Sequence, residues 1–161
     1  MIELTVPDAA SMEALGARIA PLLRAGDVLL LDGELGAGKT TLTRGLGAAL
    51  GARGAITSPT FVLAREHPTA GGVPLVHVDA YRLPGAVELD DLDLDWAGAI
   101  TVVEWGSGKV ESLVDAWLRV ALDRPTGVAA DTDGEEPDEP RRVVIRGHGA
   151  RGRELEAALR A

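Results

Sequence analysis

The stretch that most constrains the fold is LLLDGELGAGKTTL, residues 29–42, in which an apolar run leads into a glycine-rich turn, a lysine and hydroxyls. Residues 27–33 alternate too little for a half-exposed strand, which is typical of a central strand covered on both faces. A helix is predicted over residues 39–50, with Gly51 as its stop. This order of strand, turn and helix places the chain in the α/β class.

Residues 33–40 match the phosphate-binding loop pattern in full, and they lie where that pattern must lie, after a strand and before a helix. Glycines let backbone N–H groups converge on phosphate oxygens, and the helix adds the positive end of its dipole. Lys39 would reach the outer phosphates, and the Thr40 hydroxyl would ligate Mg²⁺. The residues expected to bind the nucleotide are Gly33, Glu34, Leu35, Gly36, Ala37, Gly38, Lys39, Thr40 and Thr41.

Two acids follow runs of the buried-strand type: Asp79 ends residues 73–79, and Glu104 lies near the end of 99–105. A carboxylate at the carboxyl end of such a strand lies beside the phosphate loop, where it can hold Mg²⁺ or orient the attacking water. Lys39, Asp79 and Glu104 are therefore the candidate catalytic residues, and Thr40, Asp79 and Glu104 the candidate metal ligands. Spacing alone leaves the roles of the two acids exchangeable, or lets each acid simply end a strand at the surface. Trp105, next to Glu104, fits either the nucleotide site or the core.

The rest of the chain predicts a single domain over residues 1–161 with a mixed sheet. Residues 2–6 alternate as a strand, and Ser11 is the expected cap of the first helix. Residues 60–66 and 73–79 have hairpin spacing, and 117–123 and 141–147 are expected to be neighbouring strands. Residues 87–96 read as helical or irregular, and 154–159 as a terminal helix. The expected fold is a P-loop NTPase-like three-layer arrangement, with a mostly central sheet flanked by helices.

Charge and composition restrict the partners of this chain. The formal net charge is −9, whereas a protein that grips nucleic acid alone needs a concentrated basic face. Six acidic residues lie within 131–140, and we expect a disordered acidic loop at 126–140. No stretch has the roughly 18 consecutive apolar residues of a membrane helix. The expectation is a protein of the cytoplasm that reaches nucleic acid only through a partner.

Residue types missing from the chain narrow the choice of nucleotide. The sequence contains no asparagine and no glutamine. GTPases recognise guanine through an Asn-Lys-x-Asp motif and commonly hold the attacking water with glutamine. ATP is therefore favoured over GTP, and the water must be held by a carboxylate, a hydroxyl or a residue of a partner.

Other polar positions give weaker indications. Residues 58–61, SPTF, read as a turn or as a segment that senses the outer phosphate. His67, His77 and His148 are scattered without the spacing of metal ligands, which favours a packing role. Lys109 lies in GSGK, which lacks the upstream glycine of a second phosphate loop.

Four ordered blocks, GELGAGKTTLTRGL, SPTF, HVDAYRL and VVEW, resemble the TsaE (also YjeE) family, the ATPase subunit of bacterial tRNA threonylcarbamoyladenosine synthesis. The likeness covers residues from about 11 to 147. It implies that the loop binds ATP, that Asp79 assists Mg²⁺, and that Glu104 and Trp105 lie at the nucleotide site, with Thr60 in a switch-like segment. It also implies two partner subunits, TsaB and TsaD, so that tRNA is reached only through the complex.

A small-molecule kinase is the alternative, since many phosphate-loop kinases have about this size. Such an enzyme usually needs an arginine-bearing lid, for which the region from Arg141 to Arg153 is the candidate. One position departs from the family pattern, because Gly106 follows the Glu-Trp pair where proline is common. Glycine leaves the local backbone less fixed there.

Overall fold

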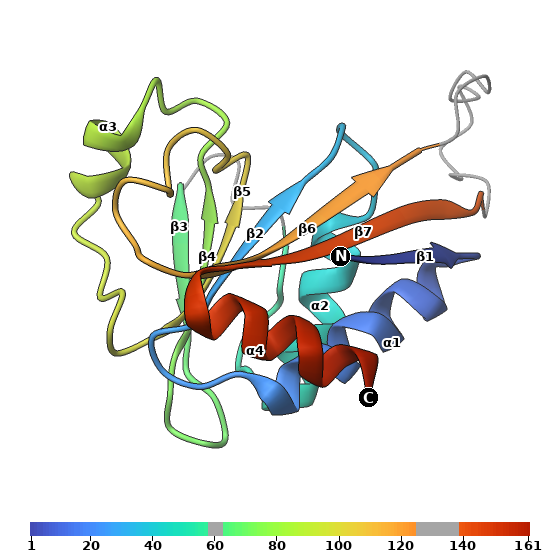
Figure 1. Cartoon of the computed structure of the whole chain (residues 1–161). Coiled ribbons are helices and arrows are strands. Elements are labelled where there is room, and N and C mark those ends of the chain that lie inside the picture. Colours follow the sequence, from blue (N-terminus) through green and yellow to red (C-terminus); the bar gives the residue numbers. More distant parts are fainter. Residues whose placement is uncertain (58–62, 125–138) are drawn as a thin grey trace, which may run out of the picture.

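The computed structural model describes residues 1–57, 63–124 and 139–161, which form a seven-stranded sheet in the order β1-β7-β6-β2-β5-β4-β3 (Figure 1). The strands are β1 (Ile2–Val6), β2 (Val28–Asp32), β3 (Ala64–His67), β4 (Leu75–Asp79), β5 (Ile100–Glu104), β6 (Trp117–Asp123) and β7 (Arg141–His148). The helices are α1 (Ala9–Ile19), the 3-10 turn η1 (Ala20–Leu22), α2 (Lys39–Leu50), α3 (Ala86–Asp90) and α4 (Gly149–Arg160).

The sheet is mixed, as predicted. β2 lies at its centre, parallel to both β5 and β6, and β4 is parallel to β5. The predicted hairpin is antiparallel β3–β4, and the predicted neighbours 117–123 and 141–147 are antiparallel β6–β7. Because β2, β4 and β5 run in the same direction, their carboxyl ends meet at one edge of the sheet, the upper edge in Figure 1.

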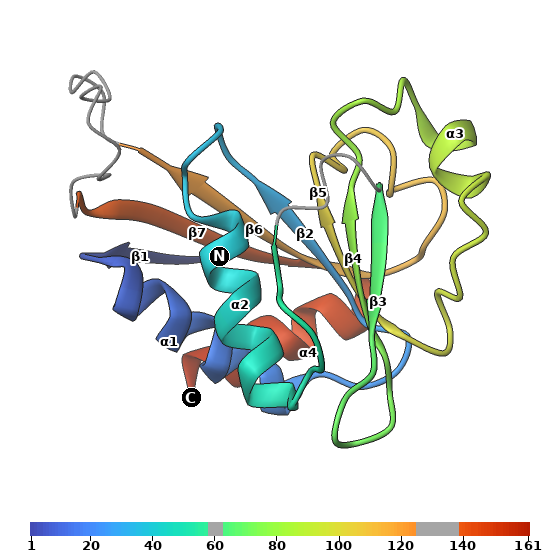
Figure 2. The ribbon, with the colours of Figure 1, turned by 180° about the vertical axis from the view of Figure 1, so that it is seen from behind.

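Both faces of the sheet are covered. On one face, buried side chains of α1, α2 and α4 pack against the strands, and Figure 2 shows α1 and α2 in front of the sheet. The other face is covered by α3 and by irregular chain between the strands, through residues such as Leu89 and Val110. Leu29, Leu30 and Leu31 of β2 are completely buried between the layers. The expected three layers are present, but the second covering layer is mostly irregular.

Several predicted boundaries were wrong. The first helix is capped by Asp8, whose Oδ1 accepts a hydrogen bond from the Ser11 backbone N–H at 2.7 Å, so the helix begins earlier than a Ser11 cap implies. An aspartate oxygen satisfies the same orphan N–H groups as a serine. The strand predicted from residue 60 begins at Ala64, because Leu63 has a positive φ of 64°. The terminal helix begins at Gly149, where β7 ends, rather than at residue 154.

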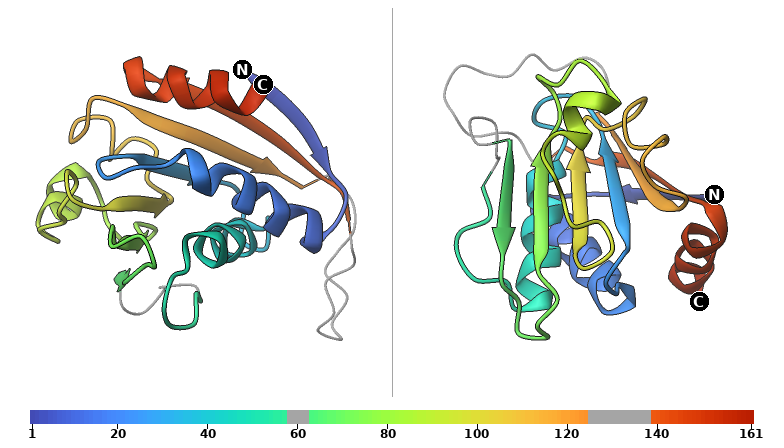
Figure 3. Two further views of the ribbon diagram at one scale, coloured as in Figure 1. Left: turned by 90° about the horizontal axis from the view of Figure 1, so that it is seen from below. Right: turned by 90° about the vertical axis from the view of Figure 1, so that its left-hand side faces the viewer.

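Two further expectations concern the acidic loop and the membrane. The loop predicted at 126–140 falls almost wholly outside the described residues, so its disorder stays a prediction. Within the described part of the chain, no helix has both the length and the apolar character needed to cross a membrane. The two termini lie on one side of the molecule (Figure 3), where the α-amino group of Met1 contacts the carboxylate of Glu156.

Candidate nucleotide-binding site

The glycine-rich turn connects the central strand β2 to α2 at the edge where β4 and β5 also end. Gly33 has a φ of 154°, and a Cβ built there would lie 2.7 Å from the carbonyl oxygen of Leu122. Gly38, the N-cap of α2, has a φ of 109° and makes no side-chain capping hydrogen bond. Only glycine adopts these conformations without strain. The first-turn N–H groups of α2, which no side chain caps, suit an anion.

Lys39 is buried at the start of α2 and is 6% exposed. Its Nζ donates hydrogen bonds to the carbonyl oxygens of Gly33, at 2.5 Å, and Glu34, at 2.9 Å. The same atom lies 4.4 Å from the centroid of the Trp105 ring, within cation–π range. Burial lowers the pKa of Lys39, and the negative charges of Glu104, Asp79 and Asp32 oppose that shift. The ammonium therefore sits among carbonyl oxygens and carboxylates.

The two candidate acids are direct neighbours across the sheet. Asp79 of β4 pairs in register with Glu104 of β5, and Glu104 pairs in turn with Leu31 of β2. Asp79 is 7% exposed and Glu104 is 3% exposed. Asp79 Oδ1 accepts a hydrogen bond from the Tyr81 backbone N–H at 2.9 Å, whereas Glu104 Oε2 lies 3.1 Å from His77 Nε2. Parallel pairing thus brings both carboxylates to the strand ends that flank the glycine-rich turn.

A cavity of about 430 Å³, here called the loop cavity, brings most of the predicted residues together. Its lining is Leu35, Gly36, Gly38, Lys39, Thr40, Thr41, Asp79, Tyr81, Arg82, Glu104 and Trp105. Three predicted binding residues do not line it. Gly33 and Glu34 offer their carbonyl oxygens to Lys39, and Ala37 is buried in the core.

The donor set in the loop cavity fits a magnesium ion. Among the described residues, no three His, Cys, Asp or Glu side chains form a metal-binding group. Mg²⁺ usually binds one or two carboxylates together with substrate phosphates and waters, and does not need such a cage. The Thr40 hydroxyl and the carboxylates of Asp79 and Glu104 line one cavity and supply hard oxygen ligands of the kind it requires.

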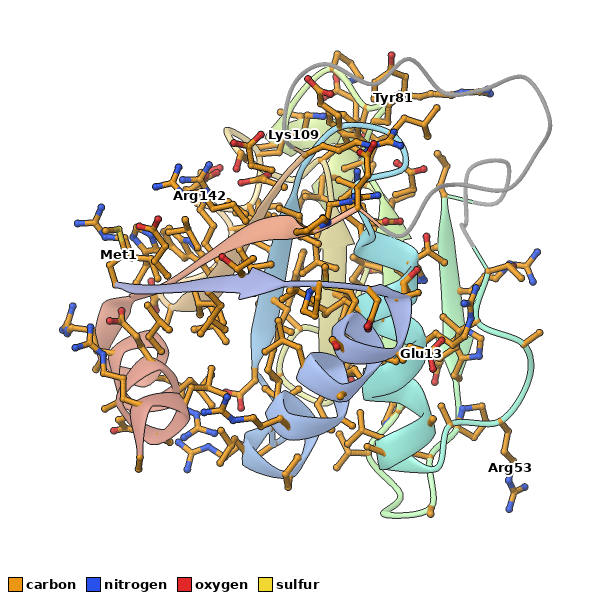
Figure 4. All side chains as sticks on the ribbon, turned by 90° about the vertical axis from the view of Figure 1, so that its right-hand side faces the viewer. Met1, Glu13, Arg53, Tyr81, Lys109 and Arg142 are labelled. Atoms are coloured by element: carbon orange, nitrogen blue, oxygen red, sulfur yellow. The ribbon has the colours of Figure 1, made fainter. Side chains whose placement is uncertain are left out.

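Bonds to the segment after β5, residues 105–109, hold the acidic side of the cavity in place. Lys109 Nζ donates to the carbonyl oxygens of Ala80, at 2.6 Å, and Trp105, at 3.2 Å, so it joins the chain after β4 to the chain after β5. Ser107 Oγ donates to Asp32 Oδ2 at 2.6 Å and ties the same segment to β2. Figure 4 shows Lys109 and Tyr81 at the same end of the molecule.

Trp105, the first residue of the segment 105–109, has an unusual backbone conformation. Its φ is 60°, in the left-handed region that costs free energy for any residue other than glycine. The ring lies 5.1 Å from that of Tyr81 in an edge-on arrangement. Trp105 therefore lines the loop cavity between Lys39 and Tyr81 and does not lie in the core.

Comparison with known proteins identifies the family to which this chain belongs. The model of the family described as "Threonylcarbamoyl adenosine biosynthesis protein TsaE" matches residues 6–130. The chain belongs to the TsaE family. A TsaE protein of Streptomyces coelicolor is 58% identical over 144 residues, which cover 87% of this chain and 93% of the relative. TsaE of Mycobacterium tuberculosis is 48% identical over 130 residues, covering 74% of this chain and 77% of the relative.

A solved structure shares the fold of this chain. The crystal structure of Bacillus subtilis YdiB superposes with a TM-score of 0.73 at 28% identity, covering 99% of this chain and 93% of the other. The comparisons confirm the resemblance that four sequence blocks indicated. Three of these blocks meet at the loop cavity, whereas SPTF, including Thr60, lies outside the described residues.

Sequence reasoning missed the packing around the two acids of this TsaE site. His77 was assigned a packing role, yet it contacts Glu104. The available signal was its position two residues before Asp79, which puts both side chains on one face of a strand. Asp32, Tyr81 and Lys109 gave no comparable signal, although Lys109 is one of only two lysines in the chain.

Proposed function

We propose that this TsaE-family chain is a Mg²⁺-dependent ATP-binding and ATP-hydrolysing subunit in the cytoplasm. It supports threonylcarbamoyladenosine modification of tRNA together with subunits of the TsaB and TsaD type. The observation that carries the proposal is the in-register pair Asp79 and Glu104 at the edge where the glycine-rich turn leaves β2. The relatives that match over most of this chain are named tRNA threonylcarbamoyladenosine biosynthesis proteins, which supplies the process.

The polar residues at the centre of the loop cavity have distinct tasks in this proposal. The N–H groups at the start of α2 bind the phosphates, and Lys39 exchanges the Gly33 and Glu34 carbonyls for phosphate oxygens. Thr40 and Asp79 would hold Mg²⁺, which when bound would neutralise charge on the phosphate oxygens. Glu104 orients the attacking water, because no glutamine exists in the chain for this task. Trp105 and Tyr81 form an aromatic wall beside Lys39.

The isolated chain should turn over slowly. Phosphoryl transfer depends on positioned positive charge, and an arginine supplied by a partner is worth about 10³ or more in rate. Within the described lining of the cavity, Arg82 is the only arginine. The net charge of −9 also suits docking on a basic partner face better than capture of tRNA by this chain alone.

The test is steady-state release of phosphate from ATP by the pure chain, with and without the TsaB and TsaD subunits. We expect slow release alone and a large acceleration in the assembly, with Lys39→Ala as the control that weakens nucleotide binding. Full turnover by the chain alone, with the phosphate transferred to a small acceptor, would favour the kinase instead.

The lid that a kinase would need is not found where the sequence suggested it. The region from Arg141 to Arg153 forms β7 and the first turn of α4. β7 pairs with β1 on one side and β6 on the other, so it is an interior strand of the sheet. An interior strand is unsuited to a movable lid, although Arg141 donates to the carbonyl oxygen of Gly36 at 3.5 Å. Transfer of phosphate to an acceptor in the assay above would support the kinase reading.

A further inference from the structure

A buried histidine lies behind one of the two acids of the loop cavity. His77 of β4 is completely buried, and its Nε2 lies 3.1 Å from Glu104 Oε2. Since a carboxylate oxygen accepts, Nε2–H donates. His77 precedes Asp79 by two residues in the strand, so the side chains of His77, Asp79 and Glu104 are on the same face of the sheet. Nothing in the proposed chemistry uses this histidine.

We propose that His77 is a positioning residue that holds Glu104 in its working orientation. The inference rests on the proposed function, because it assigns the reason why Glu104 can orient a water. His77 binds Oε2, which leaves Oε1 as the oxygen that addresses the nucleotide side of the loop cavity. Histidine thus fixes the carboxylate without occupying the cavity, since His77 is not part of the lining.

The charges around Glu104 explain why its carboxylate needs the hydrogen bond from His77. Glu104 is 3% exposed, and its charge acts on the ammonium of Lys39. A buried carboxylate needs hydrogen-bond donors, and a glutamate has flexible torsions with which to reach them. Without a donor behind it, the carboxylate would turn toward Lys39. A displacement of about 1 Å in a catalytic group can cost roughly a hundredfold in rate.

A second buried histidine provides an internal comparison. His67 of β3 is 5% exposed and its Nδ1 lies 2.8 Å from the carbonyl oxygen of Arg53. This bond ties a strand to a loop, and the acceptor belongs to the backbone. His77 has the same kind of burial but donates to a side chain that lines the loop cavity. Removal of either ring should cost stability, and only removal of His77 should affect turnover through Glu104.

The experiment compares four single variants and one double variant within the TsaB and TsaD assembly. The single variants are His77→Leu, His77→Gln, His67→Leu and Glu104→Ala, and the double variant combines His77→Leu with Glu104→Ala. Glutamine places an N–H donor near the position of Nε2. We expect His77→Leu to lower turnover about ten- to a hundredfold with ADP affinity changed less than about twofold, and His77→Gln to recover most of the loss. His67→Leu should leave turnover unchanged. In a Glu104→Ala background, His77→Leu should have no further effect.

Equal losses in His77→Leu and His77→Gln would overturn the proposal, as would a loss that persists at full size in the Glu104→Ala background. A readout that needs no turnover is the His77 ring N–H signal in the NMR spectrum of the isolated chain. Glu104→Ala should shift the His77 ring N–H signal and speed its exchange with solvent, while the His67 signal stays in place. An unchanged His77 signal would contradict the hydrogen bond between His77 and Glu104. If the parent assembly hydrolyses no ATP, the proposed function fails, and the NMR result still decides the contact.

Discussion

The two sides of the loop cavity are built in different ways. The side made of residues 33–41 is one contiguous stretch, whose shape follows from glycines with positive φ and from the start of α2. The opposite side comes from the ends of β4 and β5, and is held by the pairing of Asp79 with Glu104 and by the contacts of His77 and Lys109. One side is set by local sequence, and the other by contacts between distant segments.

This difference suggests that the two sides of the loop cavity have different roles. The contiguous side offers backbone N–H groups and one ammonium, which in the proposed function bind the phosphates of the nucleotide. The assembled side offers two carboxylates, which in the proposed function hold the metal ion and orient the water. Substitutions on the first side should therefore change affinity for the nucleotide, and substitutions on the second should change turnover or the dependence of binding on Mg²⁺.

Glu104→Ala should have the largest effect on turnover. Loss of a group that orients or activates water costs on the order of 10²–10⁴-fold in rate. ADP affinity should stay close to that of the parent, as measured by calorimetry beside phosphate release in the full assembly. The matched variant is Asp79→Asn, which should instead weaken the Mg²⁺ dependence of binding. Parental hydrolysis by Glu104→Ala would show that the assignment of Glu104 is mistaken.

Lys39→Ala should act on affinity. Its Nζ donates to two carbonyl oxygens of the glycine-rich turn and would donate to phosphate in the complex. Loss of a charge-assisted contact is worth about 1.5–3 kcal/mol, which is on the order of ten- to a hundredfold in the dissociation constant of Mg·ATP. Calorimetric titration measures this dissociation constant, and an unchanged value would show that Lys39 does not bind the nucleotide.

The contiguous side could be predicted from the sequence almost completely. The spacing of Gly33, Gly38 and Lys39 gave the turn, and the helix 39–50 has the predicted bounds. This worked because the helix start and the glycine conformations depend on neighbouring residues. The central position of β2 followed equally well from its unbroken apolar run, since a strand buried on both faces needs no polar alternation.

The assembled side could be predicted only in part. Two acids at strand ends were visible, and parallel pairing placed them together. The partners of these acids were not visible, because His77 meets Glu104 only when β4 and β5 are neighbours in this register. Lys109 reaches Ala80 only because the chain turns back after Trp105 with a positive φ. The spacing of two residues puts His77 on the face of Asp79, but no short-range pattern in the sequence encodes the contact of His77 with Glu104 or that of Lys109 with Ala80.

Lys109→Met should have a smaller effect than either site variant. The substitution keeps the length of the side chain and removes both hydrogen bonds to the Ala80 and Trp105 carbonyls. We expect turnover to fall about three- to tenfold and the free energy of unfolding to fall by about 1–3 kcal/mol. Lys109→Arg keeps a donor and should lose less.

The control for Lys109 lies in the same part of the chain. Glu111 Oε1 accepts a hydrogen bond from the exposed Gly108 N–H at 3.0 Å. Glu111→Ala should leave turnover unchanged, because an exposed bond of this kind contributes little. If turnover falls equally in Lys109→Met and Glu111→Ala, then any substitution near the segment 105–109 lowers turnover. Lys109 would then have no special role in holding the ends of β4 and β5 together.

Glu156 of α4 does not line the loop cavity, so Glu156→Gln should leave nucleotide binding unchanged and should change only stability. The Glu156 carboxylate accepts hydrogen bonds from the Gly147 backbone N–H at 2.8 Å, from Arg160 at 2.6 Å and from the α-amino group of Met1. These donors, led by Gly147, lower the pKa of Glu156 from 4.5 to about 2. At neutral pH the variant should lose about 1 kcal/mol of unfolding free energy, since the group lies at a partly solvated chain end.

The contribution of Glu156 to stability should depend on pH. Because the pKa of Glu156 is lower in the folded chain, its stabilisation is complete above pH 4.5 and is lost as the pH falls toward 2. The difference in unfolding free energy between parent and Glu156→Gln should therefore shrink across that range, as followed by thermal melts. Glu154→Gln is the matched control on α4, because Glu154 is 63% exposed and its ion pair with Arg151 should contribute under about 0.5 kcal/mol. A parent–variant difference that stays constant from pH 5 to pH 2 would contradict the ionic role of Glu156 and leave a packing effect at the chain ends.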